Sequence, residues 1–100
     1  MSIYVLLSKL TAEGRKTIRE RPGRMKEVRA EYESAGVKVL EQYATLGPYD
    51  FVSVIEAPDN ETVSEVSVDL CSRGTIEIMS LPAIPVDSYI SALNSTKKLK

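Results

Sequence analysis

The stretch Leu46-Gly47-Pro48-Tyr49-Asp50 lies near the midpoint of the 100-residue chain and joins two segments rich in apolar and β-branched residues. These segments are Val37–Thr45 and Phe51–Ala57. Glycine and proline favour tight turns, and a short loop that contains them between two such segments is typical of a β-hairpin. The centre of the chain is therefore predicted to fold as strand, turn, strand.

Before the hairpin, residues Ile3–Leu10 predict a first strand. A short helix is expected over Thr11–Arg21, because Pro22 would interrupt it. From Met25 to Ala35 the apolar residues recur at intervals of three and four, which predicts a second helical segment packed on a core. Gly36 is expected to end this segment in the left-handed conformation.

After the hairpin, Asp59 is a predicted N-cap for a helix that runs to about Arg73. A fourth strand is expected over Thr75–Leu81 and to be stopped by Pro82 and Pro85. Val86–Leu93 predicts a short helix, followed by a frayed end.

The element order β-α-β-β-α-β predicts an α+β, ferredoxin-like sandwich. In this fold a four-stranded antiparallel sheet carries its helices on one face, and the first and third strands are central. The whole chain, residues 1–100, is predicted to be a single domain, with residues 82–100 as a C-terminal extension.

Composition excludes several classes of function. The chain has no histidine, so a Ser-His or Cys-His nucleophile pair cannot form within it. With Cys71 as the single cysteine, we expect no metal site and no internal disulfide, and we expect no cofactor and a cytoplasmic location. The net charge of −1, the absence of an apolar run near 20 residues, and the absence of a basic, cleavable N-terminus predict no signal peptide and no nucleic-acid or membrane partner.

The central residues and those that follow them also resemble a known family, the GYD domain proteins. The resemblance rests on Leu46–Asp50 and on Val54-Ile55-Glu56-Ala57-Pro58-Asp59, with support from Leu10-Thr11, Gly14 and Arg24. It implies a ferredoxin-like domain similar to the dimeric α+β barrel proteins and implies no particular activity. It is expected to extend to about Leu81 and to leave out the segment after Pro82.

Two interpretations of the turn remain open. Gly47 allows a positive φ angle, and Asp50 can accept hydrogen bonds from nearby amides to close the loop as an Asx turn. Tyr49 adds a ring with a hydroxyl group. Gly47, Tyr49 and Asp50, which are motif residues together with Glu56, then either build the hairpin or, through Tyr49 and Asp50, bind a polar ligand.

The predicted strands carry apolar residues on both faces. Helices can cover one face, and the other needs a second subunit or the Val86–Leu93 segment. We expect a homodimer or higher oligomer, because small sheet domains commonly pair through self-complementary faces.

Polar residues among these strands could form a pocket on a single face. The expected set on that face is Tyr4, Ser8, Glu41, Tyr43, Ser53 and Glu77. Buried carboxylates in such a pocket could act as acids or bases, whereas on edge strands they would only oppose aggregation. The candidate ligand-binding residues are Tyr4, Ser8, Tyr43, Tyr49, Asp50 and Ser53.

A basic stretch between Lys9 and Arg29 has three interpretations: contact with phosphate or nucleic acid, which the pI of about 5.5 disfavours, docking of an acidic partner, or a solvated face with intrahelical ion pairs. Cys71 is expected on the core side of its helix as a small apolar residue. The leading functional prediction is a homo-oligomeric module that binds a ligand or another protein. The alternative is a cofactor-independent enzyme of the dimeric α+β barrel type, which would act on a small organic substrate through Tyr and carboxylate residues.

Overall fold

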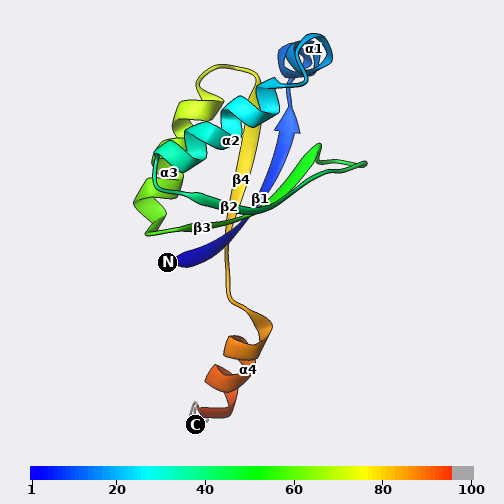
Figure 1. Cartoon of the computed structure of the whole chain (residues 1–100). Coiled ribbons are helices and arrows are strands. Elements are labelled where there is room, and N and C mark those ends of the chain that lie inside the picture. Colours follow the sequence, from blue (N-terminus) through cyan, green and yellow to red (C-terminus); the bar gives the residue numbers. More distant parts are fainter. Residues whose placement is uncertain (96–100) are drawn as a thin grey trace.

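The computed structural model describes residues 1–95 and contains four strands and four helices. The residues that follow Ser95, in the expected frayed end, lie outside this range. Figure 1 shows the elements in chain order. They are β1 (Ser2–Leu10), α1 (Ala12–Glu20), α2 (Arg24–Ser34), β2 (Lys38–Ala44), β3 (Phe51–Ala57), α3 (Asn60–Cys71), β4 (Ile76–Ala83) and α4 (Val86–Ser95).

The four strands form one antiparallel sheet in the order β2-β3-β1-β4. The central places of β1 and β3 and the ferredoxin-like α+β class are therefore confirmed. Both long helices, α2 and α3, lie on the same face of this sheet (Figure 1). We call this the helix-covered face and the opposite one the open face.

Capping groups fix where the helices begin and end. The Thr11 side chain accepts a hydrogen bond from the Gly14 amide at the start of α1, and Asp59 accepts one from the Thr62 amide at the start of α3. Both N-caps satisfy amides that no helical carbonyl can reach. After α2, Gly36 has φ of 84°, the left-handed conformation expected there.

The core lies between the helix-covered face and the two long helices. Ile55 and Val37 are almost completely buried, and Leu6, Val63 and Leu70 are buried around them. Gly14 allows α1 to approach the start of β4 closely. A Cβ at that position would lie 1.9 Å from the backbone oxygen of Thr75.

The side chains of β2 do not alternate regularly between the two faces beyond Val39. The expected placement of Glu41 and Tyr43 on the face of Ser53 is therefore wrong. Val39 pairs with Ile55 and Glu41 pairs with Val54, so one extra residue interrupts the register between them. Such a β-bulge moves every later side chain to the other face. Gln42 therefore shares the helix-covered face with Ser53, while Glu41 and Tyr43 belong to the open face.

The fourth strand also ends later than expected. It continues through Pro82, which pairs with Tyr4, as far as Ala83. Because β4 is an edge strand, the missing amide hydrogen of Pro82 need not break the ladder with β1.

The helix α4 extends away from the sheet instead of folding back over it (Figure 1). The Cα radius of gyration is 15.9 Å, whereas a compact chain of this length has about 13 Å. In the single chain, therefore, the Val86–Leu93 segment does not cover the open face.

Candidate functional site

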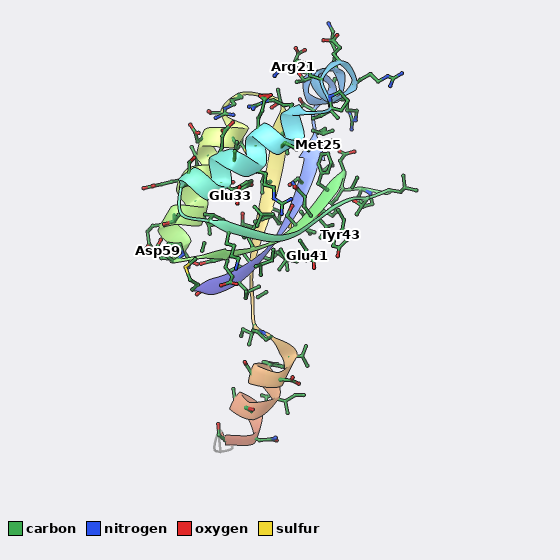
Figure 2. The ribbon with its side chains drawn as sticks, viewed as in Figure 1. Arg21, Met25, Glu33, Glu41, Tyr43 and Asp59 are labelled. Carbon is green, nitrogen blue, oxygen red and sulfur yellow. The ribbon has the colours of Figure 1, made fainter. Side chains whose placement is uncertain are left out.

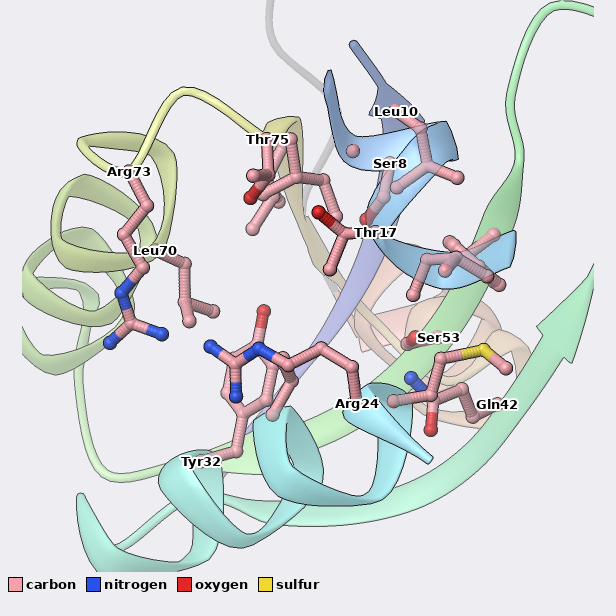
Figure 3. A pocket seen from close by; sticks show the side chains of 17 residues that line it. Ser8, Leu10, Thr17, Arg24, Tyr32, Gln42, Ser53, Leu70, Arg73 and Thr75 are labelled. Atoms are coloured by element: carbon pink, nitrogen blue, oxygen red, sulfur yellow. The ribbon is translucent and has the colours of Figure 1, made fainter. Parts of the chain in front are cut away.

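A cavity of about 130 Å³ lies between α1, α2 and the helix-covered face (Figure 3). Its walls come from all four strands and from the first three helices, so residues far apart in sequence meet there. Most of the lining is apolar: Leu10, Ile18, Met25, Val28, Phe51, Leu70, Ile76 and Ile78. Asp and Glu are absent from the lining within residues 1–95.

Thr17 and Thr75 contribute two of the five hydroxyl groups that line this apolar cavity, and the other three are buried. The three buried hydroxyls belong to Ser8, Ser53 and Tyr32, residues that are only 6–8% exposed. None of these hydroxyls has a hydrogen-bond partner within residues 1–95, yet none is sealed from a water-sized molecule. They therefore face the cavity itself. Figure 3 shows the Tyr32 ring rising from α2 with its hydroxyl group directed into the space.

The ionisation of Tyr32 is suppressed by its surroundings. Burial, with a smaller contribution from the nearby Cys71 thiol, raises the pKa of Tyr32 to about 12. At neutral pH its phenol is therefore a neutral group that can donate or accept a hydrogen bond.

Two arginines flank the cavity and are held by one carboxylate. Glu31 accepts hydrogen bonds from Arg24 at 3.2 Å and from Arg73 at 2.6 and 3.0 Å. The hydrogen bond from Arg73 is the main reason why the pKa of Glu31 lies below its ordinary value of 4.5. Arg24 also contacts Glu27, and Arg73 also contacts Asp69, so both guanidinium charges are balanced within the protein.

The central turn ties the hairpin to the end of β1. Gly47 has φ of 100°, as expected for this loop. The Asp50 carboxylate accepts a hydrogen bond of 2.7 Å from the amide of Leu10, and the Asp50 amide donates to the carbonyl of Ser8. The expected local closure by the Asp50 side chain is therefore wrong, because its amide partner lies 40 residues earlier in the chain. The Thr45 hydroxyl, which donates to the carbonyl of Tyr49, closes the loop instead.

The structure divides the expected polar pocket between the two faces of the sheet. Tyr4, Ser8 and Ser53 lie on the helix-covered face, and the Tyr4 hydroxyl donates to the side-chain oxygen of Asn60, the first residue of α3. Tyr43 donates to Glu41 at 2.8 Å on the open face (Figure 2). The single-face arrangement is thus wrong, and the bulge in β2 is the cause for Glu41 and Tyr43.

Glu77 on β4 also belongs to the open face, because it pairs with Lys9 of β1, which lies on that face. Glu56 is half-buried on that face, opposite Lys38. The carboxylates of the expected acid–base pocket are therefore separated by the sheet from the cavity. The polar part of the cavity lining consists instead of hydroxyl groups, Gln42 and the two arginines.

The open face is rich in apolar side chains. Three central residues of β1 and two of β3 are half-buried there, and Met79 and Leu81 on β4 are 50% and 41% exposed. The register places them side by side: Ile3, Val5, Leu7, Val52, Val54, Met79, Leu81 and Ala83. No helix in the described part of the chain covers them.

The helix α4 carries a second exposed apolar surface. Val86, Tyr89, Ile90 and Leu93 recur at the spacing of one helical face, and each is 49–70% exposed. No residue of α4 is buried. Figure 2 shows this helix standing apart from the sheet, with side chains on both sides of it.

The basic stretch is partly neutralised by ion pairs. Arg21 and Arg24 both contact Glu27, at 2.7 and 3.1 Å. The intrahelical ion-pair interpretation is confirmed for Arg24, which contacts Glu27 three residues later in α2, whereas Arg21 precedes that helix and contacts Glu27 from outside it. Lys9, Arg15, Lys16, Arg19, Lys26 and Arg29 have no acidic partner among the described residues. Cys71 is half-buried on α3, with its sulfur 4.0 Å from the Ser67 hydroxyl.

The sequence alone does not mark Tyr32, Arg24 or Gln42 as neighbours of Ser8 and Ser53. Tyr32 lies in the apolar stripe of its helix, where it resembles any core aromatic residue. The sequence does not show on which face of the sheet Gln42 lies, because the bulge that decides this is defined only by the pairing with β3. Arg24 is the one residue of the three that also supports the family resemblance, and this is the only sequence signal that sets it apart from other surface arginines.

Neither a metal cluster nor a spanning helix is found in the part of the chain that the structure describes. Residues 1–95 contain no group of three or more His, Cys, Asp or Glu residues arranged to hold a metal ion. No helix among them has the length and apolar character needed to cross a bilayer.

Comparison with known proteins extends the resemblance along most of the chain. The family model of the GYD domain matches residues 4–93, which include α4 as well as the sheet. The match thus continues beyond Leu81, where it was expected to end. A curated relative from Thermus thermophilus is named "Glutamine synthetase and cystathionine beta-lyase binding protein". It is 48% identical over 94 residues, which cover 93% of this chain and 99% of the relative.

Proposed function

This chain belongs to the GYD domain family, and on that premise we propose that it is a homo-oligomeric interaction module that binds other proteins. The whole chain acts as a single domain in this proposal, with α4 as part of the binding apparatus. We also propose a cytoplasmic location, which a single half-buried cysteine suits.

The uncovered apolar side chains of the open face carry the proposal. A monomeric protein rarely exposes a contiguous apolar patch larger than a few hundred Å², and larger patches commonly mark interaction sites. The patch here spans β1, β3 and β4, with charged residues such as Lys9 and Glu77 near its edge. A second copy of this chain fits the patch, because a two-fold axis would place apolar residues against the same apolar residues.

The exposed helix α4 supports the same arrangement. Helices of about ten residues are marginal in water unless tertiary contacts stabilise them. In the single chain α4 has no buried residue, so its apolar stripe has no such support. In a dimer, the α4 helix of each copy would pack on the other copy, and both exposed apolar surfaces would be buried together.

The name of the Thermus relative supports partners other than self. That protein is named for binding glutamine synthetase and cystathionine beta-lyase, and nearly its whole length aligns with this chain. We therefore propose the corresponding enzymes of this protein's own host as its partners. The oligomer would present the binding surface to them.

Titration of the purified host enzymes against the immobilised protein tests this proposal. The wild-type chain should bind at least one of them, and Leu81→Lys should weaken that binding because it places a charge in the open face. Val68→Lys is the matched control, since Val68 is an exposed apolar residue on α3, away from the patch. Absence of binding to both enzymes, or equal binding by the two variants, would contradict the proposal.

A further inference from the structure

We propose that the cavity beneath α1 and α2 binds a small, neutral aromatic compound that carries one hydroxyl or carbonyl group. This ligand site lies on the helix-covered face, across the sheet from the surface proposed to bind proteins. It does not depend on that interaction, so the two proposals can fail separately.

The volume of the cavity sets the size of the ligand. An engineered apolar cavity of about 150 Å³ in another protein takes up benzene. The cavity here is of similar size, about 130 Å³. A single six-membered ring with one small substituent therefore matches it, whereas a nucleotide or a fused-ring cofactor is too large.

The walls set the apolar character of the ligand. Val28, Leu70, Ile76 and Ile78 surround the space with branched aliphatic groups, and Phe51 adds an aromatic ring. Such surfaces favour a flat apolar molecule through dispersion contacts and the removal of apolar area from water.

The three buried hydroxyl groups favour a polar substituent on that ring. Ser8 and Ser53 lie on neighbouring strands and point to the same face, and Tyr32 faces them from α2. A water-sized molecule can reach these hydroxyls, so a ligand group that hydrogen-bonds to one of them replaces water and gains about 0.5–1.5 kcal/mol. Because each of these hydroxyls can donate and accept, both a ligand hydroxyl and a ligand carbonyl can be bound.

The electrostatics favour a neutral ligand over an anion. The phenol of Tyr32 is neutral at pH 7, as an ordinary tyrosine is, and burial keeps it neutral to higher pH by raising its pKa to about 12. Arg24 and Arg73 are the cationic residues at the cavity, and both contact Glu31. A ligand carboxylate would have to share these arginines with Glu31, Glu27 and Asp69, which already balance their charge, whereas a phenol needs no cationic partner.

Titration of the full-length protein with phenol, toluene and benzoate, followed by ¹H–¹⁵N NMR, tests the inference. Phenol should shift amide signals of residues around the cavity and bind more tightly than benzoate. Tyr32→Phe and Ser53→Ala each remove one hydroxyl group and add no atoms. Each should weaken phenol binding roughly three- to tenfold, while toluene binding, which does not use these hydroxyls, should stay unchanged.

A variant that fills the cavity provides a second test. Val28→Phe adds a ring to the cavity wall and should abolish binding of both phenol and toluene, while Ala30→Phe, at an exposed position on the same helix, should leave it intact. The inference is overturned if phenol does not bind near the cavity, if benzoate binds as tightly as phenol, or if Val28→Phe binds phenol normally. Retained toluene binding in Tyr32→Phe and Ser53→Ala shows that these variants keep a folded cavity.

Discussion

The two faces of the sheet are built from the same strands and have different surroundings. On the helix-covered face, α2 and α3 bury residues such as Ile55 and Leu6 to 1–2% exposure. On the open face, the neighbouring residues Val54 and Val5 remain half-exposed, and Met79 and Leu81 are more exposed still. Both faces are apolar, so the difference lies in the cover that one chain can provide.

The difference between the two faces indicates that one stabilises the fold of the single chain and the other is available for association. The helix-covered face accounts for the folding of the single chain and encloses a small cavity. The open face and α4 contribute less to that folding and retain apolar area for association. Substitutions on the two faces should therefore affect different measurements.

The largest expected effect comes from truncating neighbouring residues of β3. Ile55→Ala removes a side chain that is 1% exposed, and it should lower the free energy of unfolding by about 3 kcal/mol. Val54→Ala, one residue away on the open face, should cost much less at concentrations where the protein is monomeric. Urea unfolding at several protein concentrations measures both, and equal losses at the lowest concentration would remove the distinction between the faces.

Gly14 tests the close packing of α1 at one end of the helix-covered face. Gly14→Ala introduces a Cβ that would lie 1.9 Å from the Thr75 carbonyl oxygen, so α1 must shift. We expect a loss of about 2 kcal/mol, because overpacking outweighs the better helix propensity of alanine. Gly23→Ala is the control, since its Cβ would meet no atom within 4 Å. Similar thermal midpoints for the two variants would contradict this packing.

The smallest expected effect concerns the ion pairs of Glu31 at the cavity. The pKa of Glu31 is lowered in the folded state, chiefly by Arg73, so its carboxylate stabilises the protein above pH 4.5. This stabilisation is lost as the pH falls below that value and the carboxylate is protonated. Because the group is one-third exposed, Glu31→Gln should cost only about 0.5–1 kcal/mol at pH 7.

A comparison across pH checks this assignment. The difference in stability between wild type and Glu31→Gln should shrink towards zero as the pH falls from 4.5 through the lowered pKa of Glu31, below which both side chains are neutral. Glu33→Gln on the same helix is the control, because Glu33 has no ion-pair partner among residues 1–95. A difference for Glu31→Gln that stays constant from pH 7 to pH 3 would show that the ion pairs do not contribute.

The fold could be predicted from local features of the sequence. Thr11 and Asp59 mark helix starts, Gly36 marks a helix end, and the Gly47 turn marks the hairpin, and these groups act on neighbouring residues. The bulge after Val39 could not be predicted, because an extra residue in one strand is defined only by its pairing with the other. The hydrogen-bond partner of the Asp50 carboxylate could not be predicted either, because it is the amide of Leu10, which is distant in sequence.

The candidate site was harder to predict than the fold. Ser8 and Ser53 were identified because polar residues stand out in apolar strands. Tyr32 was not identified, because its helical spacing is that of a core residue and only the packing of α1 and α2 leaves space beside its hydroxyl group. Glu41 and Tyr43 were grouped with the serines because the alternation was extended through the bulge.

The mass of the protein in solution tests the central claim, that the open face is covered by a second copy. Light scattering coupled to size-exclusion chromatography at micromolar concentration should give at least twice the 11.1 kDa of one chain. Leu81→Lys should shift the protein towards the monomer, while Val68→Lys should not. A wild-type protein that elutes with the mass of a single chain would contradict the claim.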